Sequence, residues 1–230
     1  MYGLDSLFYA FEKLPLKDVK WLILADEDVL FLENRALKRI IEEMESANYT
    51  VAGVRDGGTI PNRRHNPYVP NTFFCVLDYQ NISTLYSRKE IQKQQYSSPK
   101  EFAEDLKNLH VAFDAASLYE PYYCFFLWLK RKNHKFLFLN ADLLHPDTDE
   151  LATEVYDLDN KPFLIHTWYA RAYGKNAAQT KRIDTIIDSY APDSNDHAEE
   201  AEVYKDEFFK YKLGFRKLKK RIQNKLGKVF

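Results

Sequence analysis

The sequence predicts an α/β protein with a mostly parallel or mixed central sheet that is flanked by helices. Three short apolar runs bounded by polar residues predict strands at residues 19–25, 51–54 and 72–77. Between the first two runs, apolar residues recur at helical spacing and predict an amphipathic helix: Leu37, Ile40, Ile41 and Met44. A strand, a helix and a second strand in this order are typical of a βαβ unit.

The first of these runs, residues 19–25, ends directly at three acidic residues, Asp26, Glu27 and Asp28. The run is almost entirely apolar and does not alternate with polar residues. This pattern is typical of a strand that is buried on both faces of a mostly parallel sheet.

Further elements are predicted on both sides of this unit. Residues 4–14 carry an apolar face at helical spacing and predict a helix. A second helix is expected from Pro121 to about Asn133, because proline is favoured at the first helical position. Apolar residues cover most of its sides, so we expect it to be buried. The remaining predictions are two strands and a polar segment of surface helix and loop, at residues 135–139, 163–165 and 81–108.

The composition is that of an ordinary globular protein, with 45% hydrophobic and 29% charged residues among 230. The net charge of −1 produces no strong field, so we expect no nucleic-acid partner. Cys75 and Cys124 each lie in an apolar stretch, which favours buried, reduced thiols. The sequence begins without a basic and apolar leader, and its longest apolar run, residues 122–129, is too short to cross a bilayer. We therefore expect a cytoplasmic location.

The strongest candidate for chemistry is the pair Asp26 and Asp28. Ligands of open α/β sheets bind beyond the carboxyl ends of the strands, which is where this pair is predicted. Two neighbouring carboxylates need a partner for their charge, and a hard cation such as Mn²⁺ or Mg²⁺ provides one. The cation could also hold a diphosphate and stabilise the charge of a leaving group. Alternatively, the acids only favour the N-terminus of the following helix.

Residues 21–31 resemble the D-x-D segment of GT-A-type glycosyltransferases, in which an apolar strand, the two aspartates and further apolar residues follow one another. The resemblance implies a hexosyltransferase-like activity that takes its sugar from a nucleotide-diphosphate sugar. It implies that Asp28 is a direct ligand of the metal and that Asp26 contacts the metal or the ribose of the donor. The resemblance covers roughly residues 15–175.

Three later segments resemble family segments in the same order. Residues 70–74 resemble the segment that lines the donor-sugar pocket, which implies that Asn71 binds the donor. Residues 119–122 resemble the acid motif ahead of a helix, which implies that Glu120 is the general base for the acceptor hydroxyl. Residues 166–171 resemble the C-terminal segment whose histidine, His166 in this chain, completes the metal shell.

The sequence offers a rival residue or a purely structural role as an alternative to each of these assignments. Asp114 is a rival general base, and Glu120 could instead cap a buried helix. His145 is a rival metal ligand. His166 could be a hydrogen-bonded structural residue at a strand end, and Trp168 could either stack on a sugar or belong to the core.

The turn-rich loop over residues 59–68 is a further candidate, because long loops in compact domains are often functional. Arg63 and Arg64 could bind the donor diphosphate or an anionic acceptor through paired donors. They could equally be solvated surface arginines.

We expect a glycosyltransferase-like domain at residues 1–195 and a charged helical extension at residues 196–230. Residues 212–228 carry eight Lys or Arg and no acid, with apolar residues on one face: Phe215, Leu218, Ile222 and Leu226. Such a helix suits a peripheral position on the anionic inner face of a membrane, where lipid-linked acceptors lie. It could instead pack on its own domain or on a dimer partner.

The chain departs from the family at its front, because only 25 residues precede Asp26. We expect part of the nucleotide-binding half to be missing, as in a fragment, a chain with a misplaced gene start or a domain that has lost this half. The prediction is a metal-dependent glycosyltransferase of polysaccharide biosynthesis, with a cell-surface glycan or a lipid-linked molecule as acceptor. The alternatives are a non-catalytic remnant that binds a partner or a membrane, and a metal-dependent phosphohydrolase.

Overall fold

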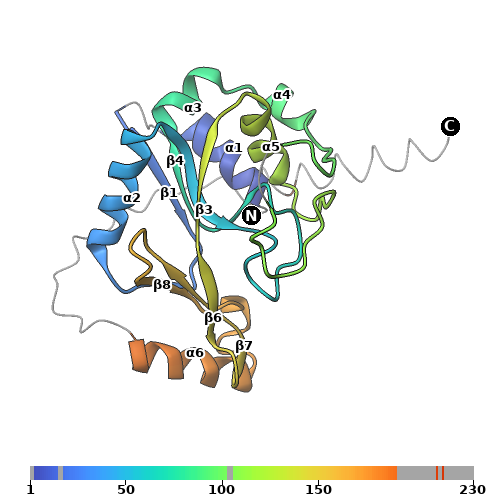
Figure 1. The fold of residues 1–230 in the computed structure, drawn as a ribbon. Helices are drawn as coiled ribbons and strands as arrows, with labels where there is room; N and C mark the ends of the chain where they lie inside the picture. The colour runs from blue at the N-terminus through green and yellow to red at the C-terminus, as the bar shows by residue number, and fades with distance from the viewer. Residues whose placement is uncertain (1–2, 15–17, 103–105, 191–210, 212–213, 215–230) are drawn as a thin grey trace. The chain divides into compact units, whose positions relative to one another are not determined.

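The computed structural model describes residues 3–14, 18–102, 106–190, 211 and 214. The elements named within these residues are eight strands in two four-stranded sheets, together with six α-helices (Figure 1). The chain divides into two compact units, Met1–Pro192 and Asp193–Phe230, and all of these elements belong to the first. The basic helix predicted at residues 212–228 lies outside the described residues, apart from Gly214.

The first sheet has the strand order β1-β4-β3-β5, formed by Trp21–Ala25, Pro70–Asp78, Tyr49–Arg55 and Lys135–Leu139. β4 is antiparallel to β1 and to β3, whereas β3 and β5 are parallel. The α/β class and a mixed sheet are therefore confirmed, but the expectation of a mostly parallel sheet is wrong. The reason is that the chain folds back after β3, so that β4 enters the sheet between β1 and β3, which themselves run in the same direction.

The expectation that residues 19–25 form a doubly buried strand is also wrong. β1 lies at an edge of the sheet, and among the described strands it pairs with β4 alone. Leu22 and Leu24 pack against one core and Trp21 against another, which explains why the strand is apolar on both faces. Its edge position still leaves Ile23 38% exposed.

A second, antiparallel sheet has the order β2-β8-β7-β6, formed by Val29–Phe31, Pro162–His166, Asp149–Tyr156 and Ala141–His145. The sequence predicted only its strand β8. Two short links join this sheet to the first one, residues 26–28 between β1 and β2, and Asn140 between β5 and β6. The acidic segment therefore lies at the junction of the two sheets.

Three predicted helices are confirmed as α1 (Gly3–Lys13), α2 (Asn34–Ser46) and α5 (Tyr123–Arg131). α5 begins two residues after Pro121, and the left-handed Asn133, with a φ of 62°, follows its end. The polar segment expected at residues 81–108 contains parts of the short helices α3 (Tyr79–Leu85) and α4 (Arg88–Gln92). α6 (Ala177–Tyr190) was not predicted, because few of its residues are buried.

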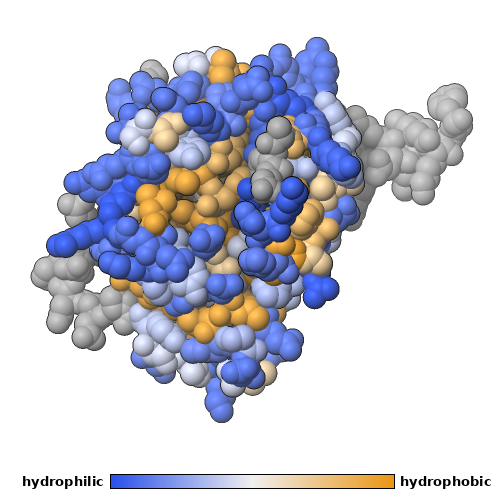
Figure 2. Space-filling view, in the orientation of Figure 1, coloured by the Kyte–Doolittle hydropathy of each residue, from blue (hydrophilic) through white to orange (hydrophobic). Residues whose placement is uncertain are grey.

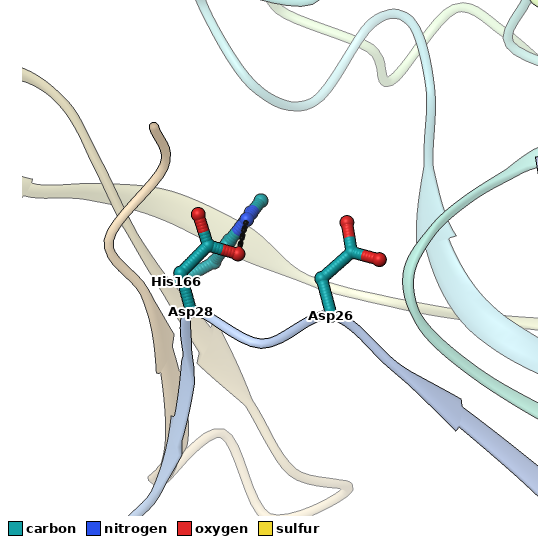
Figure 3. A group of neighbouring side chains, drawn as sticks. All are labelled: Asp26, Asp28 and His166. Carbon is teal, nitrogen blue, oxygen red and sulfur yellow. Dashed lines mark hydrogen bonds and ion pairs between the residues drawn. The ribbon is translucent and has the colours of Figure 1, made fainter. Parts of the chain in front are cut away.

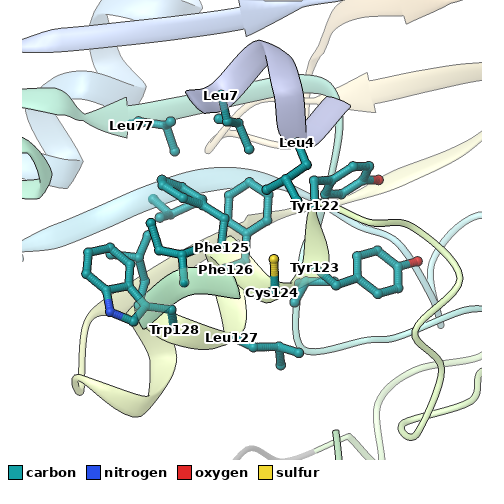
Figure 4. Close-up of a cluster of buried hydrophobic side chains, with 14 of the residues drawn as sticks. Leu4, Leu7, Leu77, Tyr122, Tyr123, Cys124, Phe125, Phe126, Leu127 and Trp128 are labelled. Carbon is teal, nitrogen blue, oxygen red and sulfur yellow. The ribbon is translucent and has the colours of Figure 1, made fainter. Parts of the chain in front are cut away.

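α5 is the centre of the largest core. A helix that is apolar on all sides has to be buried. All seven residues from Tyr123 to Leu129 are buried in this structure. Leu4 and Leu7 of α1 and Leu77 of β4 lie over the aromatic residues of α5 (Figure 4). Both cysteines are free and buried, as predicted.

The face of the molecule in Figure 2 has hydrophilic residues around most of its rim and hydrophobic residues gathered nearer its middle. Apolar atoms make up a large share of most protein surfaces, so exposed apolar residues are not by themselves a sign of function. None of the helices in the described part of the chain has the length and apolar character that a membrane span requires.

Candidate functional site

The three predicted metal ligands, Asp26, Asp28 and His166, come together at the junction of the two sheets. Asp26 follows β1, Asp28 precedes β2, and His166 ends β8, where it lies opposite Val29 in the strand pairing. One ligand atom from each of the three residues lies within 4.8 Å of the others. Figure 3 shows the two carboxylates pointing the same way from the link, with His166 beside Asp28.

The distance between two of these atoms matches that between adjacent ligands of one divalent cation. His166 Nε2 lies 3.1 Å from Asp28 Oδ1. Adjacent ligands of an octahedral ion with bonds of about 2.1 Å are about 3 Å apart, and opposite ligands are about 4 Å apart. The imidazole is 2% exposed, and its Nδ1 has no hydrogen-bond partner among the residues described. Two carboxylates and an imidazole are a suitable donor set for Mn²⁺, and the carboxylates also suit Mg²⁺.

The two carboxylates differ in their electrostatics. Burial raises the pKa of Asp26; His166 opposes this rise, whereas Asp28 and Glu27 add to it. Solvent still reaches the Asp26 side chain, so its charge is partly screened. Burial alone would raise the pKa of Asp28, but its hydrogen-bond contact with His166 and the hydrogen bond from the Ala170 N–H lower it below its usual value. Of the two carboxylates, the ionised form of Asp26 would therefore be stabilised more by an added positive charge.

A turn of unusual backbone geometry follows His166. Trp168 and Tyr169 both have positive φ, 59° and 64°, which costs about 1–3 kcal/mol for each residue other than glycine. Thr167 N donates to the Asp28 carbonyl oxygen at 2.9 Å, and Ala170 N donates to Asp28 Oδ2 at 3.1 Å. The turn therefore fixes both the backbone and the carboxylate of Asp28.

Arg182 of α6 holds this turn. Its Nη2 donates to the carbonyl oxygens of Thr167 and Trp168, the second at 2.9 Å, and its Nη1 donates to Asp149 Oδ2 at 3.0 Å. Burial would raise the pKa of Asp149, but backbone N–H groups and Arg182 lower it. The sequence did not point to Arg182 or Asp149, because bonds to backbone carbonyls leave no pattern in the chain.

A second polar cluster lies at the end of β3. Asp56 is 0% exposed and accepts two hydrogen bonds from Arg63, at 2.7 and 2.8 Å. Asn71 Nδ2 at 2.6 Å and the hydroxyl of Tyr123 also donate to Asp56. Arg63 Nη2 donates in addition to Glu120 Oε1 at 3.2 Å. Burial would lower the pKa of Arg63, but its hydrogen bonds with Asp56 raise it, so the guanidinium stays charged.

Two glycines shape the loop that brings Arg63 back to Asp56. A Cβ on Gly57 would lie 2.0 Å from the His65 carbonyl oxygen, and Gly58 has a φ of +86°. Both positions therefore require glycine. Asp56 was not predicted as a site residue, although it directly follows β3 as Asp26 follows β1.

The two clusters are neighbours. The guanidinium of Arg63 lies 5.8 Å from the ring centre of Trp168, whose ring is 4.1 Å from that of His166. Phe73 stacks on His166 at 4.3 Å. Asp26 and Asp56, the acids of the two clusters, directly follow β1 and β3, which run in the same direction beside β4.

Three predicted candidates lie outside both clusters. Asp114 is exposed, and its Oδ1 accepts from Ala116 N at 2.9 Å. Arg64 is exposed, and its Nε donates to the Pro61 carbonyl oxygen at 3.2 Å. His145 Nε2 lies 3.3 Å from the hydroxyl of Tyr190, on α6.

A pocket of about 280 Å³ opens beside Asp28, between β2, the turn after His166 and α6. It is lined mainly by apolar side chains, among them Leu30, Ile183 and Ile187. The pocket offers room for part of a ligand next to Asp28, one of the three candidate metal ligands.

Comparisons of this chain with protein-family models, with curated proteins and with solved structures find no match. The site brings possible divalent-cation ligands into the same region as Glu120, a carboxylate that is held by the part-buried Arg63.

Proposed function

We propose that this chain is a metal-dependent glycosyltransferase of the GT-A type, which moves a hexose from a nucleotide-diphosphate sugar to a glycan or lipid-linked acceptor. The observation that carries the proposal is the convergence of Asp26, Asp28 and His166, of which the last two are 138 residues apart in the chain. Mn²⁺ or Mg²⁺ held by these side chains keeps coordination positions for phosphate oxygens.

In this proposal Asp26, Asp28 and His166 would hold a cation, which would stabilise the negative charge on the nucleotide diphosphate when the bond between its oxygen and the anomeric carbon breaks. The acceptor hydroxyl oxygen forms the new bond to that carbon and gives its proton to Glu120. Arg63 fixes one oxygen of Glu120 at 3.2 Å, and Asp56 fixes Arg63. The buried pair thus orients the base.

The contacts of Asn71 and Arg63 favour positioning roles for both. Asn71 uses its Nδ2 on Asp56 and its Oδ1 on the N–H of Phe73, at 2.6 and 3.0 Å. Arg63 directs donors to Asp56 and Glu120. Donor binding in this proposal relies on the metal, because Arg64, which lies in the same loop as Arg63, is outside both clusters.

A thermal-shift titration with Mn²⁺ and UDP, GDP or CMP tests the proposal. One nucleotide should raise the melting temperature by about 5–10 °C at a hundred times its dissociation constant, and only with Mn²⁺ present. Asp28→Ala should abolish the shift. Asp142→Ala, which removes an exposed acid of β6, is the matched control and should keep it.

Two outcomes would contradict the proposal. If no nucleotide shifts the melting temperature with Mn²⁺, the chain is better explained as a non-catalytic remnant. If the protein instead releases phosphate from nucleotides at full rate without any acceptor, it acts as a metal-dependent phosphohydrolase.

A further inference from the structure

Tyr119 presents an exposed aromatic platform directly before Glu120. Its side chain is 65% exposed, although the His65 ring stacks on it with centres 4.1 Å apart and planes 6° apart. Since His65 covers one face, the exposed area belongs to the other face and the edge of the ring. Tyrosine combines an apolar ring with a polar hydroxyl group and is enriched at interfaces, so an open Tyr ring beside Glu120 can take part in ligand binding.

The platform is held rigidly by the loops that carry it. Buried Asn66 donates through its Nδ2 to the carbonyl oxygens of Ala115 and Ser117, at 3.2 and 3.1 Å. Asp114 N donates to the His65 carbonyl oxygen at 3.0 Å. These bonds tie the segment before Tyr119 to the loop that carries His65. A ligand would therefore lose little binding energy to ordering this surface.

The charges around the platform favour a neutral, polyhydroxylated ligand. Arg63 lies 5.6 Å from the Tyr119 ring centre, but its charge is balanced by Asp56 and Glu120. The Glu120 carboxylate, 28% exposed, can accept hydrogen bonds from hydroxyl groups and would repel a phosphate. Arg64 is the exposed cation of the same loop, and its Nε is already bonded to Pro61.

We propose that Tyr119 and His65 form the acceptor subsite, which binds a pyranose ring of an uncharged glycan. The apolar C–H face of the sugar packs on the open face of Tyr119, and a hydroxyl group of the sugar reaches Glu120. The inference rests on the proposed function, because it assigns the acceptor side of the same site. It specifies the acceptor as a neutral sugar, not a phosphosugar or a nucleoside.

Saturation-transfer NMR on the full chain tests the inference, with the methyl glycosides of glucose, galactose and N-acetylglucosamine as probes. At least one glycoside should bind, and Tyr119→Ala should weaken its binding about tenfold, the size expected for the loss of an aromatic contact. Tyr119→Phe keeps the ring and should bind like the parent protein. Tyr96→Ala is the matched control, because Tyr96 is 51% exposed and packs on Arg131 instead.

Two outcomes would overturn the inference. The first is that no glycoside gives a signal that depends on Tyr119. The second is that Tyr119→Ala abolishes the Mn²⁺-dependent effect of UDP or GDP, which would make the platform a nucleobase site.

Failure of the proposed function would look different. Asp28→Ala should lose the nucleotide effect and keep glycoside binding. If the parent protein binds a glycoside through Tyr119 but shows no Mn²⁺-dependent nucleotide effect, the sugar subsite stands and the transferase proposal fails.

Discussion

Asp26 and Asp28 carry pKa shifts of opposite sign, and stability depends on pH differently for each. The raised pKa of Asp26 means that its ionisation destabilises the folded protein at neutral pH; this cost disappears as the pH falls below the pKa of an unfolded aspartate. The lowered pKa of Asp28 means that its charge stabilises the fold at neutral pH. This stabilisation is lost as the pH falls through its folded-state pKa.

We therefore expect Asp26→Asn and Asp28→Asn to act in opposite directions without metal. At pH 7 in EDTA, Asp26→Asn should raise the melting temperature by about 1–3 °C, a figure kept small because solvent screens this side chain. Asp28→Asn should lower it. Both differences should shrink as the pH is lowered towards about 3. A change of the same sign in both variants at pH 7 would contradict this account.

The buried pair of Asp56 and Arg63 should behave as a unit. Asp56→Ala removes the buried carboxylate that accepts two hydrogen bonds from the Arg63 guanidinium, and we expect it to reduce the free energy of unfolding by about 3–5 kcal/mol, measured in urea. Asp56→Ala combined with Arg63→Met should cost clearly less than the sum of the two single changes.

The matched control for this pair is Asp159→Ala, which breaks the ion pair between Arg39 and a side chain that is 54% exposed. It should cost less than about 1 kcal/mol. Equal costs for Asp56→Ala and Asp159→Ala would show that burial does not set the strength of the first pair.

At the scale of elements, α6 supports the metal ligands through Arg182. Arg182→Ala removes the bonds to the carbonyl oxygens of Thr167 and Trp168, so the strained turn should loosen and Asp28 should be held less well. We expect Mn²⁺ affinity, measured by calorimetry, to fall by about 10–100-fold. Lys181→Ala, an exposed neighbour, should have no effect. If Arg182→Ala lowers the melting temperature but leaves the Mn²⁺ affinity unchanged, the role of Arg182 is purely structural.

The elements that the sequence predicts are those whose pattern is local. α2 shows helical periodicity, α5 is apolar throughout, and β3 and β4 are apolar runs between turns. Most of the second sheet was not predicted, because its strands lack such a local pattern. β2 has only three residues, and in β6 and β7 exposed and buried residues are mixed, so these strands depend on partners far along the chain.

The candidate site, like the helices and strands, was predicted only in part. Asp26 and Asp28 lie at a strand end, where their chemistry can be recognised, and the family resemblance added His166. No sequence pattern identifies the role of Arg182, because it binds backbone carbonyl oxygens that any residue could provide. The roles of Asn71 and Arg63 as partners of a buried acid could be seen only once Asp56 was placed between them.

At the scale of the whole molecule, a bound cation would connect the two sheets. Asp26 directly follows a strand of the first sheet, and His166 ends a strand of the second. We expect Mn²⁺ to slow amide hydrogen exchange at the adjoining ends of both β1 and β8, because binding stabilises the native state against opening. EDTA should reverse the effect, and Asp28→Ala should show none. Slower exchange in only one sheet would mean that the ion does not bridge them.

The pairing of β2 with β8 also sets when this site can form. Asp28 and His166 are 138 residues apart, and closing so long a loop carries a large entropic cost that local contacts do not repay early in folding. During synthesis the acidic pair emerges long before its histidine, so the three ligand atoms cannot meet until β8 and the turn behind it have left the ribosome. In this protein a metal ion would therefore bind only late in folding, and its binding could not nucleate the fold.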